Sequence, residues 1–291
     1  MRTVTELMQL FLNCLVLSAN YILLALGLTL IFGILRALNF AHGVLYITGA
    51  YVVYALAKLT GMNYFLATFI AMIVVGGLGL LIEASILYPL ADRVKVAALG
   101  AILGVSMVLE GVLAFIFEGE DVTIGSFFTG TVSMVGATLS VERIMVVVLC
   151  GLVMVGVYGW IQKTRQGMAI RALAENPRVA NLQGINTRLI RFLVMAMASV
   201  VAAFAGAIVT PLFYINPFMG GHVVFKALLI VAVGGMGSIE GSILAGLLIG
   251  FVECIGVTYL GPIAEVISFV MVIAIFLFRP RGLLGVEYEF H

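Results

Sequence analysis

Charged side chains are scarce in this sequence, because Asp, Glu, Lys and Arg together make up only 10% of its 291 residues. Soluble domains carry about 25%. The 15 basic and 14 acidic residues nearly cancel, so the chain lacks the clustered cationic excess that phosphate binding needs, and nucleic acid is excluded as a partner. Hydrophobic residues, at 63%, are too numerous for a water-soluble core. Membrane lipid is therefore the expected surrounding of this chain.

The sequence also lacks the motifs of common nucleotide-binding and catalytic sites. No Gly-Lys dipeptide occurs, which excludes the phosphate-binding loop G-x-x-x-x-G-K-[ST], and H-E-x-x-H is absent as well. The histidines show no ligand spacing, and Cys14, Cys150 and Cys254 lie far apart in apolar runs. We therefore expect no metal, no cofactor bound by this chain, no catalytic residue and no enzymatic activity.

The sequence contains long continuous apolar runs, whereas the strands of a membrane barrel would alternate between apolar and polar residues. They predict an all-α, polytopic transmembrane helix bundle that forms one domain over residues 1–291. The first six runs are long enough to cross a hydrocarbon core of about 30 Å, and three more follow them along the chain. The runs lie near residues 7–35, 42–58, 64–88, 97–117, 142–162, 192–214, 223–238, 240–258 and 262–278. The first is longer than needed and the seventh is short, so either one could be broken or re-entrant, which gives eight or nine membrane segments.

Basic residues set the expected orientation, because Lys and Arg accumulate in cytoplasmic loops. Six of the fifteen lie between residues 163 and 191. Arg93 with Lys95, and Arg279 with Arg281, mark two further inside segments, whereas residues 118–141 hold three acidic residues and no basic one. With nine crossings, the N-terminus is expected outside and the C-terminus in the cytoplasm.

Glycine gathers with polar residues at two interruptions of the apolar pattern. The first is Asn39-Phe40-Ala41-His42-Gly43, and the second runs from Gly234 to Gly241. Two interpretations stand: tight packing between helices, or unwound backbone that lines a passage, as in transporters. His42 is expected to bond backbone at its turn. The candidates for the passage or gate are Asn39, His42, Gly43, Gly235, Gly237, Ser238 and Gly241.

Acidic residues also occur inside the apolar runs, where an ionised carboxylate costs about 2.5–3.5 kcal/mol on insertion scales. Glu83, Glu110, Glu253 and Glu265 must therefore face protein or water. The last three are expected in the outer half, where they bond neighbouring helices or meet an ammonium group. Glu110 and Glu253 are the main intramembrane candidates. Lys226, beside His222, is expected at the membrane interface.

The basic loop at about 163–191 contains one short helix by local rules. Asn176 is a good N-cap, Pro177 fits the first helical position, and Gly184 fits the left-handed residue after the end. Val179 and Leu182 make this helix mildly apolar although it lies in water. It is either an ordinary structured loop or a docking site for a partner.

Four ordered segments together carry a family resemblance. They are Ala25 to Gly33 with Asn39 to Gly43, Ala174-Glu175 with Gly184-Ile185-Asn186, Gly234 to Ser238 with Gly241, and Phe278 to Gly285. This set resembles the LivH-type permeases of branched-chain amino acid ABC importers almost from end to end. One departure is that Ala84 follows Glu83, where the family often has Arg, so local loop contacts are expected to differ.

The resemblance implies a type II ABC importer-like permease in the cytoplasmic (inner) membrane of a prokaryote. Such a chain forms half of a translocation pathway for branched-chain or related amino acids. The implied partners are a second related permease subunit, two ABC ATPase subunits that use the ATP, and an external solute-binding protein. The residues implied in coupling to the ATPase are Ala174, Glu175, Pro177, Ala180 and Gly184.

Other interpretations remain open from the sequence. Relatives in the same family carry urea, short amides or aromatic acids, so the resemblance leaves the solute undecided. A stand-alone secondary carrier or channel would use Glu110 and Glu253 as coupling carboxylates. A structural subunit without its own passage is the third class, and it predicts that the Gly-rich segments have no influence on the choice of solute.

Overall fold

A computed structural model describes residues 2–35, 39–91, 95–127, 130–134, 137–261, 263–279 and 282–285. The first half of the chain forms α1 (Arg2–Leu35), α2 (Ala41–Tyr54) with the π-helical η1 (Ala55–Leu59), α3 (Tyr64–Ile82) with the π-helical η2 (Glu83–Leu87), α4 (Lys95–Ile116), β1 (Thr131–Met134) and β2 (Ala137–Ser140). The second half forms α5 (Val141–Lys163), α6 (Arg165–Glu175), α7 (Pro177–Leu182), α8 (Thr187–Val209), α9 (Met219–Gly234), α10 (Ile239–Leu260) and α11 (Ile263–Phe278).

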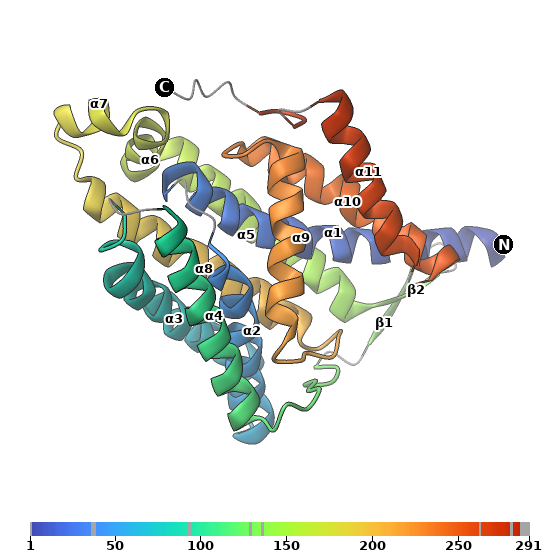
Figure 1. Ribbon diagram of the computed structural model, residues 1–291. Coiled ribbons are helices and arrows are strands. Elements are labelled where there is room, and N and C mark those ends of the chain that lie inside the picture. The colour runs from blue at the N-terminus through green and yellow to red at the C-terminus, as the bar shows by residue number, and fades with distance from the viewer. Residues whose placement is uncertain are drawn as a thin grey trace.

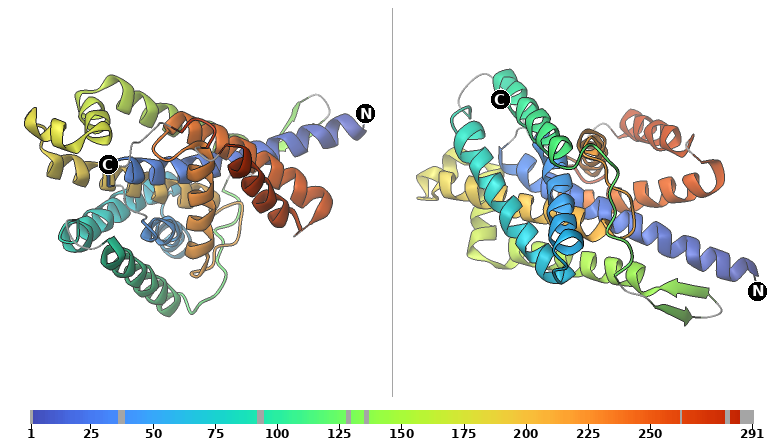
Figure 2. Two further views of the ribbon diagram at one scale, coloured as in Figure 1. Left: turned by 45° about the horizontal axis from the view of Figure 1, so that its top comes forward. Right: turned by 90° about the horizontal axis from the view of Figure 1, so that it is seen from below.

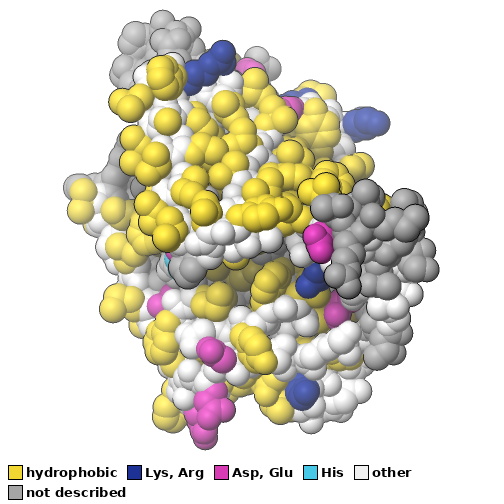
Figure 3. All heavy atoms as spheres, turned by 90° about the vertical axis from the view of Figure 1, so that its right-hand side faces the viewer, with side chains coloured by type: hydrophobic (Ala, Val, Ile, Leu, Met, Phe, Trp, Pro, Cys, Tyr) yellow, Lys and Arg dark blue, Asp and Glu magenta, His cyan; other side chains and the backbone are white. Residues whose placement is uncertain are grey.

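The predicted helical bundle is confirmed, with a helix over each of the nine apolar runs. Among the described residues, six helices are long and apolar enough to cross a membrane, and α9 and α11 are shorter apolar helices of 16 residues each. Hydrophobic side chains cover much of the face in Figure 3. The sequence did not predict α6 or the antiparallel β1–β2 hairpin. The predicted anchors Arg93 and Arg281 lie outside the described residues.

The long helix α1 runs through the middle of the bundle, with α10 packed along it (Figures 1 and 2). Small residues permit this close approach. A Cβ at Gly246 would lie 2.8 Å from Ile22, and one at Gly250 would overlap with Ser18. In the α2–α8 pair, Gly206 lies against the backbone carbonyl of Tyr46 in the same way. Glycine residues therefore allow the core helices to pack with their backbones in close contact.

The connections between helices fall at two ends of the bundle. At one end, Val122 pairs with Ile215 in an antiparallel bridge, and Lys58 Nζ donates to the Ile124 carbonyl at 3.5 Å. At the opposite end, the Leu283 amide donates to the Val233 carbonyl at 2.7 Å. The helix α9 leads from the first end to the second, and α1 is unbroken over 34 residues, so neither helix is interrupted along its described length.

Candidate functional site

Two short helices lie outside the bundle, in the loop expected at about 163–191. Thr164 caps α6, since its hydroxyl accepts from the Gly167 amide at 3.0 Å. Gly167, Ile170 and Leu173 are the buried residues of α6, and their spacing of three places them on one helical face. Arg171 donates to the Ile161 carbonyl at the end of α5. These contacts hold α6 against the bundle.

The helix α7 confirms the predicted short helix and its boundaries. Asn176 Oδ1 accepts from the amides of Arg178 at 3.0 Å and Val179 at 3.1 Å, Pro177 is the first residue, and Gly184 has φ +80°. A six-residue helix has almost no intrinsic stability. Its caps therefore fix its position.

The residues of the predicted coupling set differ in exposure, since Glu175 and Gly184 are exposed and Pro177 is half-buried. Ala180 is only 3% exposed and packs into the core. Leu182 is 88% exposed and Val179 is 48% exposed. Val179 and Leu182 thus form an apolar stripe beside the exposed Arg178 and Asn181, and α7 projects beyond the bundle in Figure 1.

The start of α8 connects this loop to α3. Thr187 donates to Asn181 of α7 at 2.8 Å. One turn further along α8, Arg191 Nε pairs with Glu83 Oε1 at 2.9 Å. The Glu83 side chain is fully buried at the junction of α3 and η2, and Arg188 lies 4.9 Å from the centre of the Tyr88 ring. Glu83 thus finds its cation on a different helix.

The first Gly-rich interruption is buried inside the chain. Asn39 Oδ1 accepts from the Ala41 amide at 3.0 Å, and His42 Nε2 lies 3.1 Å from the Leu24 carbonyl oxygen, which confirms the predicted backbone bond. Gly43 lies directly against the Gly220 carbonyl of α9. The contacts of this turn support the packing interpretation.

The second interruption is also packed. Ser238 caps α10 by accepting from the Gly241 amide at 3.0 Å, and Gly241 lies against the Gly234 carbonyl. Gly235, at φ +103°, is in contact with the backbone of Gly285. Gly237, with φ +86°, is the only gate candidate of this turn that is not fully buried among the described residues.

These contacts give a prediction for the gate candidates. We expect Gly43→Leu to lower the yield of folded protein and its unfolding midpoint, because overpacking costs about 1–3 kcal/mol or more. Gly77→Leu in α3 is the matched control, since a Cβ there meets nothing within 4 Å. Size-exclusion profiles and thermal unfolding in detergent measure both. A Gly43→Leu protein that folds normally but no longer transports would support the gate interpretation instead.

An ion cluster lies among α1, α9, α10 and α11. Lys226 of α9 contacts Glu253 of α10 and lies 3.1 Å from Glu265 of α11, and its Nζ donates to the Tyr21 hydroxyl at 3.1 Å. Tyr21 donates to Glu253 at 2.8 Å. Lys226, which was expected at the membrane interface, is only 8% exposed inside the chain. Two carboxylates and a hydroxyl replace water around its ammonium group.

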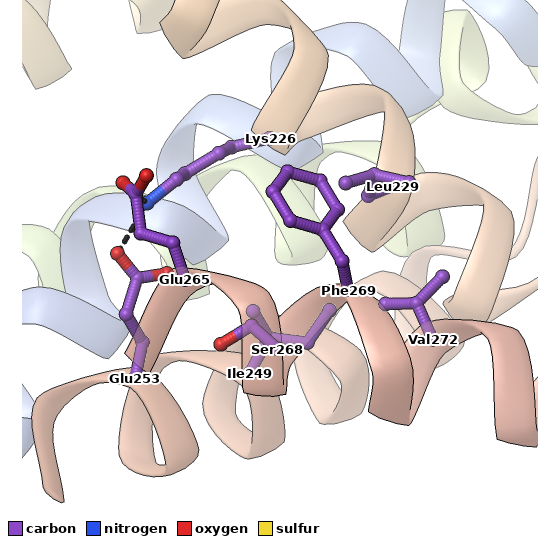
Figure 4. Close-up of a pocket in the computed structure, with 8 residues that line it drawn as sticks. All are labelled: Lys226, Leu229, Ile249, Glu253, Glu265, Ser268, Phe269 and Val272. Atoms are coloured by element: carbon purple, nitrogen blue, oxygen red, sulfur yellow. Dashed lines mark hydrogen bonds and ion pairs between the residues drawn. The ribbon is translucent and has the colours of Figure 1, made fainter. Parts of the chain in front are cut away.

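The cluster has a polar end and an apolar end, as Figure 4 shows. Lys226, Glu253 and Glu265 converge at the polar end. Glu265 also lies 3.3 Å from His222 Nε2. The remaining residues that line the same pocket are Leu229, Ile249, Ser268, Phe269 and Val272.

Glu110 does not join this cluster. Its carboxylate accepts a hydrogen bond from the backbone amide of Gly221 in the first turn of α9. A carboxylate at this position satisfies a free amide and complements the helix dipole. Of the two acidic candidates, Glu253 therefore pairs with a lysine and Glu110 caps a helix. Within the described part of the chain, no group of three or more His, Cys, Asp and Glu residues is placed to hold a metal ion.

Comparison with known proteins agrees with this architecture. Residues 10–277 match the family described as branched-chain amino acid transport system, permease component. The chain is 33% identical to the high-affinity branched-chain amino acid transport system permease protein BraD of Pseudomonas aeruginosa, over 96% of this chain and 95% of BraD. It is 31% identical to LivH of Escherichia coli K12, of the same description, with the same coverage.

A solved structure shares the fold. PsaBC from Streptococcus pneumoniae, in complex with Fab, aligns with 91% of this chain and 89% of its own at a TM-score of 0.50 and 12% identity. The family match spans most of the sequence, and the relatives cover it almost completely. The chain therefore belongs to the family of permease components of branched-chain amino acid transport systems, and it is a transport subunit rather than an enzyme.

Proposed function

We propose that this chain forms half of the translocation pathway of an ABC importer for branched-chain amino acids. The observation that carries the proposal is α7, a capped helix held outside the bundle with Leu182 exposed. Val179 is also exposed, three positions before Leu182, and contiguous exposed apolar side chains favour a docking partner. Because the chain has no phosphate-binding loop, we assign ATP hydrolysis to that partner.

The assembly we infer contains a second related permease, two ATPase subunits that use ATP, and an external solute-binding protein. The loop that holds α6 and α7 carries most of the clustered basic residues, which favours a cytoplasmic position. The acidic segment 118–121 lies at the opposite end, beside Ile215. We therefore place the N-terminus outside and the C-terminus inside the cytoplasmic membrane of a prokaryote.

Motion at α7 has a physical route into the bundle. The hydrogen bond from Thr187 to Asn181 ties α7 to α8, and the Arg191–Glu83 pair ties α8 to α3. When the ATPases close, α7 moves with them and shifts α8 against α3. We infer that this movement tilts the bundle and opens the passage to each side in turn.

Branched-chain amino acids are the proposed solutes because BraD and LivH carry that description. Urea, short amides and aromatic acids are the alternatives within the family. A stand-alone carrier would need free coupling carboxylates, whereas Glu253 is paired with Lys226 and Glu110 accepts from the Gly221 amide. These contacts favour the importer. Uptake of L-leucine by the purified single chain in vesicles would support the carrier.

The docking role of α7 is tested with Leu182→Asp. Burial of a leucine contributes about 1.5–3 kcal/mol, so we expect the affinity for the ATPase to fall about tenfold or more. Solute-stimulated ATPase activity falls with it. The matched control is Met168→Asp, because the Met168 side chain is 62% exposed but belongs to α6 and not to α7. The measurements are copurification of the ATPase subunits and ATP hydrolysis with L-leucine and the binding protein.

The same experiment can contradict the proposal. If the Leu182→Asp complex assembles and hydrolyses ATP like the wild type, α7 is an ordinary loop helix. If Met168→Asp has an equal effect, the loss comes from any charge placed in this loop. Epitope tags at the two ends, probed in intact cells, test the orientation separately.

A further inference from the structure

A cavity of about 260 Å³, here called the hairpin cavity, lies where the β1–β2 hairpin meets α1 and α5. Figures 1 and 2 show the hairpin at the start of α5, beside the N-terminal part of α1. One water molecule needs only about 10–15 Å³ of such space, so the hairpin cavity has room for a head group of several heavy atoms. The residues that line it are Gln9, Leu12 and Asn13 of α1, Thr131 and Ser140 of the hairpin, and Arg143 and Ile144 of α5.

The cation of the hairpin cavity is Arg143, in the first turn of α5. Its Nη1 atom donates to Asn13 Oδ1 of α1. A guanidinium group carries five N–H donors in a planar fork, so this bond holds the group in place and leaves donors for an anion. None of the described residues that line the cavity is acidic. The neighbouring carboxylate of Glu142 is only 7% exposed and accepts from the Phe127 amide at 3.1 Å. The hairpin cavity therefore favours an anion.

Two hydroxyl groups line the same cavity as Arg143. Thr131 and Ser140 are paired directly across the hairpin, and the side chains of such a pair lie on the same face. Ser140 is also the N-cap residue of α5, and its hydroxyl makes no capping hydrogen bond among the described residues. Charge-assisted hydrogen bonds from a guanidinium, together with hydroxyl donors, are suited to phosphate oxygens. The polar lining of the cavity thus matches a phosphate group.

The hairpin cavity lies at the level of lipid head groups. The helix α5 has 23 residues, which gives a length of about 35 Å at 1.5 Å per residue, close to the hydrocarbon thickness of about 30 Å. Arg143 is the third residue of this helix, so it lies near the end of the membrane span. Its partner Asn13 lies at the same level, and α1 continues beyond it to Arg2. Lipid phosphates of the adjoining leaflet occupy this level.

An apolar stripe leads from the hairpin cavity into the membrane. Ile144 lines the cavity, and Val148, Leu152 and Val155 follow it along α5 at intervals of four, four and three residues. This spacing places them on one helical face. Each of the last three is more than half exposed. A phospholipid whose phosphate lies in the cavity can place an acyl chain along this stripe, whereas a free phosphate would leave it uncovered.

We propose that the hairpin cavity binds the head group of an anionic phospholipid, with the phosphate on Arg143 and one acyl chain along the stripe on α5. The polar side chains of α1 and of the hairpin accept or donate to the hydroxyls of the head group. A zwitterionic head group would place its ammonium beside Arg143, where like charges repel and the described lining offers no carboxylate. Phosphatidylglycerol therefore fits better than phosphatidylcholine. The proposal requires only that the chain spans a membrane and is independent of the solute.

The test measures protection of a cysteine placed in the cavity wall. Ser140→Cys is introduced into the full chain, which is purified with its partner subunits and placed in nanodiscs. Cys14, Cys150 and Cys254 are buried, so the parent chain gives the background. We expect methyl methanethiosulfonate to modify position 140 at least threefold more slowly when the nanodiscs contain phosphatidylglycerol beside phosphatidylcholine than in phosphatidylcholine alone. Val132→Cys is the matched control, because Val132 lies on the opposite face of β1, is 41% exposed and does not line the cavity.

A variant then tests the cation. Arg143→Gln keeps a hydrogen-bonding side chain and removes the charge, and we expect protection by phosphatidylglycerol to disappear. Lys58→Gln is the matched control, because Lys58 is an exposed cation at the same end of the bundle and does not line the cavity. Protection at the wild-type level in the Arg143→Gln chain overturns the proposal. The comparison of the two lipid mixtures in the Ser140→Cys chain decides the question even if Arg143→Gln fails to assemble.

Two other occupants of the cavity would give different results. Glycerol phosphate at millimolar concentration that protects position 140 as strongly as phosphatidylglycerol does would show a site for soluble anions, and would overturn the lipid proposal. A cysteine at position 140 that resists modification even in phosphatidylcholine alone would show that another subunit covers the cavity, and would overturn the proposal as well.

Discussion

Replacing Lys226 by Met should lower the free energy of unfolding by about 3–5 kcal/mol, because removal of one partner leaves a buried charge uncompensated. Glu253 is the residue most affected, since its side chain is only 7% exposed. The loss also removes the contact that joins α9 to α10 and α11. Thermal unfolding of the purified protein in detergent, followed by circular dichroism, measures the effect.

A second substitution separates charge from packing. Lys226→Met combined with Glu253→Gln removes the ammonium together with the nearest carboxylate, so we expect it to recover a substantial part of the stability. Lys58→Met is the matched control, because Lys58 is exposed and makes one long hydrogen bond to a carbonyl. A Lys226→Met protein that unfolds at the wild-type midpoint would contradict the buried cluster.

Arg191→Gln should have an effect of similar size. It leaves the fully buried Glu83 carboxylate without its partner at the junction of α3 and η2, and the expected loss is about 3–5 kcal/mol. The 19% exposure of the Arg191 side chain admits some water, which favours the lower end of that range. The midpoint of thermal unfolding in detergent again measures the loss.

Two further variants test whether the loss comes from the unpaired charge. Arg191→Gln with Glu83→Gln should be more stable than Arg191→Gln alone, since no isolated charge remains. Arg188→Ala is the matched control, because it removes only a cation–π contact with Tyr88, which contributes about 0.5–1 kcal/mol at an exposed site. Equal losses of unfolding free energy for Arg188→Ala and Arg191→Gln would mean that the Arg191–Glu83 ion pair contributes no more to stability than the cation–π contact.

Local patterns in the sequence were enough for the spans and for α7. Apolar runs have only one solution in lipid, so the helices followed directly. The ends of α7 followed from Asn176, Pro177 and Gly184, because a cap, a fixed φ and a left-handed residue act within a few positions. The same local rules would have found α6, since Gly167, Ile170 and Leu173 recur at a helical spacing.

Contacts between distant segments were beyond these rules. Lys226 was placed at the interface because nothing in its neighbourhood indicates that Glu253 and Glu265, 27 and 39 positions away, converge on it. The coupling set implied by the resemblance contains Ala180, which is buried, because a motif match names positions without saying which of them turn inward. Likewise, the sequence around Gly43 is equally consistent with tight helix packing and with a passage lining. The contact between Gly43 and Gly220 is visible only in the structure.

The hydrogen bond between Leu283 and Val233 has a consequence for the order in which the molecule matures. The Leu283 and Leu284 amides satisfy carbonyls at the end of α9, about fifty residues earlier in the chain, and apolar surroundings make free carbonyls unfavourable. These carbonyls gain their donors only after the segment that follows α11 has been translated. The turn between α9 and α10 is therefore completed only after α10 and α11 have been made, and a chain that stops after Phe278 should remain a substrate for membrane quality-control proteases.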